Sequence, residues 1–394
     1  MQQGIKGLFT SGLFGNDAIV NDLPNEVLIT YPGLANTLFA MSARMKQGSV
    51  SGNQFSWQDS AVDIPIVRAS TQVAADGTTL TLAGANANTL CKMMMIMNAT
   101  TKEYFYVTNQ SGATLTVKRG MCGSTAGVIA TTDDLYVLYQ VSPEASSRPP
   151  SRYYKPAHHT NYVQIIRTLT EVSKTSLKTN YRGVKPSEYI KKMAYQDHVM
   201  QCELAMMFGR KGVATVVDAD GVEKPMYMTD GIYNQIKTNR TAFTDSNPVT
   251  LKSFITAVNQ AFGRSVDGMA GNSKLAFTSR LVLEKISALM LDNKTYIMKA
   301  GETEYGIKVN KIICPSGEIN LIADAAFDAL PAYQGSMVVM DPNLFEAKYN
   351  DKTVAEDASE PGKDSVATVM TSRLGVKVQC EECNAVIDGL LFNG

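Results

Sequence analysis

NYVQIIRTLTEVSKTSL at residues 161–177, followed by KPSEYIKKMAYQDHVMQCELAMMFGRKG at residues 185–212, holds the clearest structural signal in the chain. The first stretch has the β-branched composition of a strand. The second follows helical spacing, and Pro186 suits a first turn because its missing N–H costs nothing there. Gly209 is suited to end the helix, which would be roughly 35 Å long at about 1.5 Å per residue. The sequence thus predicts a strand followed by one long helix.

The composition predicts a folded chain with two or three modules. Of its 394 residues, 44% are apolar and 19% are charged, so large cores can form. Lys and Arg together number 37, as do Asp and Glu, and the formal net charge is zero. A protein that mainly grips nucleic acid would carry a basic excess, because contacts to phosphates supply most of its affinity. We therefore expect another primary task.

The chain shows no signal for export or for a membrane. Residues 1–20 lack the charged and apolar regions of a signal peptide, and no apolar run reaches the roughly 20 residues of a membrane span. The six cysteines, at positions 91, 122, 202, 314, 380 and 383, do not form a disulfide framework in a chain of this length. We expect a reducing cytoplasm and no membrane partner.

The N-terminal part is expected to be an arm followed by β structure. Residues 1–50 read as an extended arm with one short helix near 34–45, and residues 53–67 alternate like a strand. Residues 70–140 look all-β, and YFYVTNQSGATLTVKRG at 104–120 predicts a hairpin that turns at Asn109–Gly112. The Pro- and Ser-rich residues 142–156 predict a linker.

The C-terminal part mixes helical and strand patterns. Residues 225–340 alternate helical stretches with short apolar strands, which is α+β or α/β character. Residues 347–365 predict a polar loop. Residues 365–390 predict two β-runs around a turn at Arg373–Gly375.

Two cysteines in a C-x-x-C arrangement, Cys380 and Cys383, are the first candidates for chemistry. A structural zinc site needs four ligands, and no second pair of this kind exists in the sequence. A redox dithiol favours a helix N-terminus, whereas this pair follows a β-run and flanks Glu381 and Glu382, which would raise a thiol pKa. We interpret the two cysteines as having no shared role.

Other motifs also favour a structural interpretation. The adjacent His158 and His159 would point apart in a strand, and GMCGSTAG at 120–127 lacks the lysine and the following helix of a phosphate loop, so a turn is expected. The sequence contains no catalytic signature. We expect no enzyme, cofactor or metal. Two alternatives remain open: a β-rich carbohydrate-binding or adhesin-like protein, from the module at 70–140, and a hydrolase or thiol enzyme.

Several stretches in order resemble the major capsid (coat) proteins of tailed bacteriophages with the Hong Kong 97-type fold, in the subgroup with a β-rich module inside the extended loop. NYVQIIRTLTEVSKTSL (161–177) is the most specific of them. The others are FSWQDS (55–60), YFYVTNQSGATLTVKRGMCGSTAG (104–127), CELAMMFG (202–209), MTDGIYNQI (228–236), MDPNLFEAKY (340–349) and CNAVIDGL (383–390).

The resemblance implies an α+β fold with four parts. Residues 1–50 would be an N-terminal arm along neighbouring subunits, and residues 51–160 an extended loop with an inserted β module. Residues 161–225 and 346–394 would form a peripheral domain that includes the spine helix at 185–209. Residues 226–345 would form the axial domain.

The resemblance also implies a non-enzymatic function. Hexamers and pentamers would build an icosahedral head around double-stranded DNA, in the virion and, during assembly, in the host cytoplasm. The partners would be other copies, a portal protein, a separate scaffold or cement protein, and DNA held by weak non-specific contact. Phe55, Trp57 and Arg119 are the expected intersubunit contacts. Aromatic residues dominate interface hot spots, although a buried intrachain role is equally open for Phe55 and Trp57. Lys191 and Lys192 on the spine helix are the expected DNA-facing residues.

Overall fold

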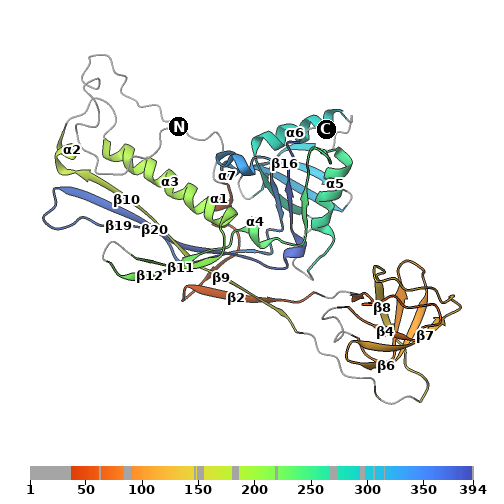
Figure 1. Ribbon diagram of the computed structural model, residues 1–394. Coiled ribbons are helices and arrows are strands. Elements are labelled where there is room, and N and C mark those ends of the chain that lie inside the picture. Colours follow the sequence, from red (N-terminus) through yellow and green to blue (C-terminus); the bar gives the residue numbers. More distant parts are fainter. Residues whose placement is uncertain are drawn as a thin grey trace. The chain divides into compact units, whose positions relative to one another are not determined.

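Figure 1 shows the computed structural model of the chain, coloured along the sequence. The structure describes residues 37–61, 64–83, 90–145, 148, 155–179, 186–217, 221–266, 273–292, 298–304, 307–314 and 316–392. The chain divides into two compact units. We call Ser60–Ala157 the barrel unit, and Met1–Asp59 together with His158–Gly394 the body unit.

A long helix on a four-stranded sheet forms one half of the body unit. The sheet has the order β1 (Gln47–Ser49), β19 (Phe345–Asp357), β20 (Ser365–Val378) and β10 (Gln164–Ser173), and α3 (Pro186–Phe208) packs on it. Strand β10 alternates as a half-buried strand should, because Ile166 is buried and Leu169 is exposed.

A buried histidine fixes the contact between this helix and two of the strands. His198 of α3 is fully buried, and its Nδ1 lies 2.9 Å from the Thr168 hydroxyl of β10. Its Nε2 lies 2.7 Å from the Ser372 hydroxyl of β20. Burial lowers the pKa of His198, so the neutral ring is the form that the packing favours.

Helix α3 ends where the sequence predicts. Gly209 follows the last helical residue and donates its N–H to the Ala205 carbonyl at 3.1 Å. A side chain at this position would lie 2.6 Å from the Thr229 carbonyl oxygen, so only glycine fits the close approach of the two segments. The prediction that Gly209 stops the helix is confirmed.

A seven-stranded mixed sheet forms the other half of the body unit. Its order is β13 (Arg240–Ala242), β21 (Ala385–Asp388), β18 (Met337–Met340), β14 (Ser273–Thr278), β17 (Gly317–Ala323), β16 (Ile307–Cys314) and β15 (Met298–Glu304). Strands β13 and β21 run parallel, as do β14 and β17, and the other pairs are antiparallel.

Both faces of this sheet are covered. On β14, Phe277 belongs to the core that contains α3, whereas Ala276 belongs to the core that contains α5 (Leu251–Asn259) and α6 (Arg280–Asp292). On β18, Val338 belongs to the core that contains α3 and Val339 to the core that contains α5 and α6. Strands buried on both faces read as continuous apolar runs, and this explains the stretches KLAFT and SMVVM.

Shorter elements complete the body unit. Its remaining helices are α1 (Thr37–Ser42), α2 (Lys174–Lys178), α4 (Ile232–Gln235) and α7 (Ala325–Ala329). Strands β11 (Gly212–Val217) and β12 (Glu223–Met228) form a hairpin, and β2 (Gln54–Asp59) and β9 (Ala157–Tyr162) form a two-stranded ribbon. One-turn 3-10 helices lie at Gln260–Phe262, Pro331–Tyr333 and Glu381–Cys383.

The barrel unit is a closed β-structure around its own core. Its strands are ordered β3 (Ile66–Val67), β8 (Leu135–Gln140), β5 (Met94–Asn98), β6 (Tyr104–Ser111), β7 (Thr114–Met121) and β4 (Thr79–Thr81). A bridge between Ala69 and Leu82 joins the two edge strands, so the sheet has no free edge there. Phe105, Ile96 and Leu115 are fully buried inside it.

The structure differs from some of the sequence expectations and refines others. In the described part of the expected arm, Leu38 and Met41 of α1 are fully buried and β1 pairs with β19, whereas residues 1–36 lie outside the described part of the chain. Most of the predicted loop at 347–365 is strand β19, held by its ladder to β20 although its outer half is exposed on both faces. The predicted hairpin is formed by β6 and β7, and its turn includes Gly112, the last residue of the predicted turn.

The turn predicted at Arg373–Gly375 is wrong, because β20 runs through these residues. Strand β21 pairs with β18 and β13 in the seven-stranded sheet, and β19 and β20 form one sheet with β10. The peripheral domain expected from residues 161–225 and 346–394 stays a prediction.

Gly375 lies in mid-strand because an aromatic ring covers it. A Cβ atom there would lie 2.7 Å from Cε1 of Phe55 and 2.8 Å from the carbonyl oxygen of Tyr162. Glycine inside a strand commonly marks such a close approach. The ribbon formed by β2 and β9 is thus seated on β20 at this residue.

We predict that Gly375→Ala destabilises the chain by about 1–3 kcal/mol, the usual cost of overpacking, as measured by urea-induced unfolding. Gly52→Ala is the matched control, because a Cβ at Gly52 meets nothing within 4 Å. Equal stability of the two variants would show that Phe55 is not tightly packed on β20.

Candidate assembly surfaces and polar sites

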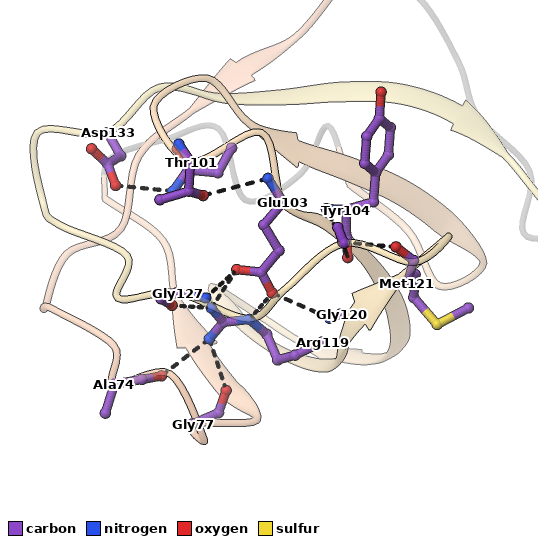
Figure 2. A network of polar contacts seen from close by, with 12 residues as sticks. Ala74, Gly77, Thr101, Glu103, Tyr104, Arg119, Gly120, Met121, Gly127 and Asp133 are labelled. Atoms are coloured by element: carbon purple, nitrogen blue, oxygen red, sulfur yellow. Dashed lines mark hydrogen bonds and ion pairs between the residues drawn. The ribbon is translucent and has the colours of Figure 1, made fainter.

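A buried ion pair organises the barrel unit (Figure 2). Glu103, which precedes β6, is fully buried, and Arg119 of β7 donates to it from Nε at 2.7 Å and from Nη2 at 2.6 Å. Backbone N–H groups of Gly120 and Gly127 also donate to the Glu103 carboxylate, at 3.2 and 3.1 Å. Burial alone would raise the pKa of Glu103, but Arg119 and the two N–H groups outweigh it and hold the pKa below its usual value.

All five N–H donors of Arg119 are used within the barrel unit. Beside its two bonds to Glu103, the guanidinium donates to the carbonyl oxygens of Ala74, Gly77 and Gly127, the first two at 3.1 and 3.2 Å. An arginine has only five such donors. These bonds tie the 74–77 loop and the 120–127 turn to the hairpin, and the intersubunit contact expected of Arg119 stays a prediction.

The glycine-rich segment at 120–127 is a structural turn, as the sequence indicates. Gly120 and Gly123 have positive φ angles of 62° and 77°, which favour glycine. The Ser124 hydroxyl donates to the Met121 carbonyl at 2.7 Å and accepts from the Tyr104 N–H at 3.0 Å. Backbone N–H groups at both ends of this turn donate to the Glu103 carboxylate. The turn therefore binds a carboxylate of its own chain and not a phosphate.

The base of the β2–β9 ribbon carries the two predicted aromatic anchors. Phe55 is 9% exposed, and its ring stacks on Trp57 with centroids 6.0 Å apart. Trp57 stacks in turn on His159 of β9 at 5.7 Å and donates from Nε1 to Asp59 at 3.2 Å. Phe55 therefore packs within its own chain, whereas Trp57 remains half-buried with part of its surface exposed. The intersubunit contacts expected of both residues stay predictions.

A hollow of about 220 Å³ lies beside this stack. Ligand sites usually have volumes of about 300–1,000 Å³ and apolar walls, whereas charged side chains line much of this one. Two of these charged side chains form intrachain hydrogen bonds. Lys211 donates from Nζ to the Thr160 carbonyl at 2.5 Å, and Glu381 accepts from the Thr238 N–H at 3.1 Å. The hollow is thus a poor fit to a substrate site.

The two lysines predicted to face DNA lie on the outer side of α3. Lys191 and Lys192 are both exposed, and they lie in the N-terminal half of the helix, away from its buried end at Cys202–Met207. Their exposure agrees with contact to a polyanion. It is also what a solvated helix face would show, so the DNA contact stays a prediction.

The C-x-x-C pair has the environment of structural cysteines. Cys380 has a left-handed backbone conformation with φ of 46°, and Cys383 is buried. Burial raises the pKa of the Cys380 thiol to about 11 and raises that of Cys383 as well, so both thiols stay protonated and unreactive near neutral pH. Within the described part of the chain, no three His, Cys, Asp or Glu side chains gather into a metal site.

Two buried acidic sites were missed at the sequence level. Glu103 and Glu203 are each fully buried, and each stands as a single acidic residue beside apolar ones, in EYFYV and CELAMM. A charged residue inside an apolar stretch was the available signal, because such residues are buried only when they have partners. Their partners, Arg119 and Asp324, are distant in sequence.

The comparisons with known proteins agree on one class. A family model described as SU10 major capsid protein matches residues 10–391. The major capsid protein of Pseudomonas phage PaMx41 is 23% identical over 353 residues, which are 88% of this chain and 82% of the relative.

No helix among the described residues is long and apolar enough to cross a membrane.

Solved structures of low sequence identity also align with the chain. One is the capsid of a native GTA particle, with 8% identity, a TM-score of 0.48, and coverage of 96% of this chain and 98% of that one. Another is from Microbacterium phage Oxtober96, with 11% identity, a TM-score of 0.47 and the same coverage.

We predict that Glu103→Gln destabilises the barrel unit by about 3 kcal/mol or more, because it leaves the buried Arg119 charge without a counter-charge. Calorimetric unfolding of the full chain measures this change. The control is Asp134→Asn, which breaks the exposed pair of Arg68 and Asp134 and should cost less than about 1 kcal/mol. Similar shifts for both variants would contradict the central role of Glu103.

Proposed function

Because the chain belongs to the SU10 major capsid protein family, we propose that it assembles into the hexamers and pentamers of an icosahedral phage head around double-stranded DNA. Membership confirms the predicted class of phage major capsid protein. The observation that carries the proposal is the family match over nearly the whole chain, residues 10–391. It favours a coat protein over the carbohydrate-binding alternative.

Uncovered apolar surface supports self-association. On the face of the four-stranded sheet away from α3, Ile165 and Leu169 of β10 are 51% and 59% exposed. The hairpin of β11 and β12 exposes Val213, Val217 and Met226, and a two-stranded ribbon is barely stable alone in water. Surfaces of this kind usually mark contacts with other chains. A zero net charge leaves little long-range repulsion between copies.

The arrangement proposed is that of the Hong Kong 97-type fold. In this proposal the four-stranded sheet with α3 is the peripheral domain, and the seven-stranded sheet with α5 and α6 is most of the axial domain around the centres of hexamers and pentamers. The barrel unit is the β module of the extended loop, which reaches a neighbouring subunit. The subgroup with such a module stays a prediction.

A non-enzymatic role fits the same proposal. The buried ion pair of Glu103 and Arg119 stabilises the barrel unit, and the two thiols at Cys380 and Cys383 have raised pKa values. These polar groups therefore serve folding. The further partners we propose are a portal protein, a separate scaffold or cement protein, and packaged DNA; assembly would take place in the host cytoplasm.

The test is the assembly state of the purified full chain, measured by mass photometry and negative-stain electron microscopy. We expect rings of five and six copies or closed shells. Trp57→Ala should lower the assembled fraction, because Trp57 is the half-buried aromatic at the ribbon base. Trp57→Phe, which keeps the ring stack, is its control.

A chain that stays monomeric even with its neighbouring phage proteins co-expressed would contradict the proposed function. If Trp57→Ala assembled as well as the unaltered chain, only the anchoring role of Trp57 would be wrong. Thermal unfolding of both variants separates a lost contact from a lost fold.

We also propose that Lys191 and Lys192 contact packaged DNA weakly and without sequence preference. Neutralising them in Lys191→Gln/Lys192→Gln should reduce the DNA retained by assembled particles, and the reduction should be smaller at higher salt, because salt weakens the lysine–phosphate contacts of the unaltered chain. The ratio of nucleic-acid to protein absorbance measures retention. Lys252→Gln, at an exposed position of α5, is the control; equal retention by both variants would exclude the DNA contact.

A further inference from the structure

Two buried carboxyl groups meet beneath the first turn of α1. Glu203 lies on α3 and Asp324 lies directly before α7, and both residues are fully buried. The N–H of Leu38 donates to both of them, to Oε1 of Glu203 at 2.9 Å and to Oδ2 of Asp324 at 3.2 Å. One donor therefore holds the two carboxyl groups close together.

The other hydrogen bonds of the pair also come largely from α1. Phe39 donates its N–H to Oε2 of Glu203 at 2.5 Å. Thr37 donates its N–H to Oδ2 of Asp324 at 3.2 Å and its hydroxyl to the same oxygen. Asp324 also caps α7, by accepting from the Ala326 N–H at 2.8 Å. The pair thus links α1 to α3 and to the start of α7.

Asp324, a second acidic residue, is the charged side chain that shifts the pKa of Glu203. Burial raises the pKa of Glu203 well above its usual value, and the Asp324 carboxylate raises it further, against the opposing effect of the Phe39 and Leu38 N–H groups. The neighbouring Cys202 thiol is itself buried, and its pKa is raised to about 11, so it stays neutral. Two adjacent buried carboxyl groups cannot both ionise readily, and such pairs hold one proton between them.

We propose that Glu203 and Asp324 share a single proton and form a pH-sensitive latch that docks α1 onto the rest of the body unit. With the proton present, one carboxyl can donate to the other while the oxygens still accept from α1. Without it, two negative charges face each other in a buried site, and water can reach them only when α1 moves away. The latch is intrachain and does not depend on the proposed assembly.

The direction of the pH dependence follows from proton linkage. The docked pair keeps a proton that an opened, hydrated Glu203 would already have released above its ordinary pKa. Docking therefore weakens as pH rises. Between the ordinary pKa of Glu203 and its raised pKa in the docked state, the opening equilibrium should increase by about tenfold per pH unit.

Hydrogen–deuterium exchange of the full chain tests this latch. The protection factor of the α1 amides, corrected for intrinsic exchange, should fall by about tenfold per pH unit over part of the range from about pH 5 to pH 9. Glu203→Gln should remove the slope, because its amide can donate to Asp324 and accept from α1 as the protonated acid does. Glu284→Gln, at an exposed position of α6, should keep the slope of the unaltered chain.

A flat profile in the unaltered chain, or an equal slope in Glu203→Gln, would overturn the proposal. Should Glu203→Gln fail to fold, infrared spectroscopy of the unaltered chain decides instead. A protonated buried carboxyl absorbs apart from carboxylates, so its band should be present at neutral pH and should disappear on the same pH rise that exposes α1. Absence of that band at neutral pH would also overturn the latch.

Discussion

The contact of α3 with the strands around it is the constraint on which the body unit depends. One face of α3 covers β10 and β20, and its buried C-terminal end shares a core with the inner face of the seven-stranded sheet. His198 fixes the helix against Thr168 and Ser372, and the close approach at Gly209 fixes where it ends. Because both sheets meet this one helix, a displacement of α3 would disturb both cores together.

The barrel unit solves a different problem, because it has a small core of its own. Its closed sheet surrounds Phe105 and its neighbours, and the Glu103–Arg119 pair fastens the loops that no strand ladder holds. A buried pair of this kind adds little net stability over apolar packing, but removing one partner is costly. The pair therefore specifies one arrangement of the loops.

The sequence predicted the elements that depend on local signals. The long helix, its stop at Gly209 and the hairpin of β6 and β7 follow from periodicity, proline and glycine placement and turn residues. The sequence prediction failed where contacts between distant segments decide the structure. Polar β19 is a strand because it pairs with β20, and Gly375 lies within a strand, with no turn, where Phe55 packs closely on it. Arg119 was expected at an intersubunit contact, and its pairing with Glu103 across the hairpin is not revealed by spacing alone.

The central claim is that one chain combines a rigid body unit with a separate barrel unit, and that copies join through surfaces left uncovered in both. A cryo-electron microscopy map of the assembled particle tests it most directly. We expect rings of five and six copies in which the barrel unit of each copy contacts a neighbouring body unit while its Glu103–Arg119 pair stays intact. A map in which each barrel unit contacts only its own chain would contradict this account.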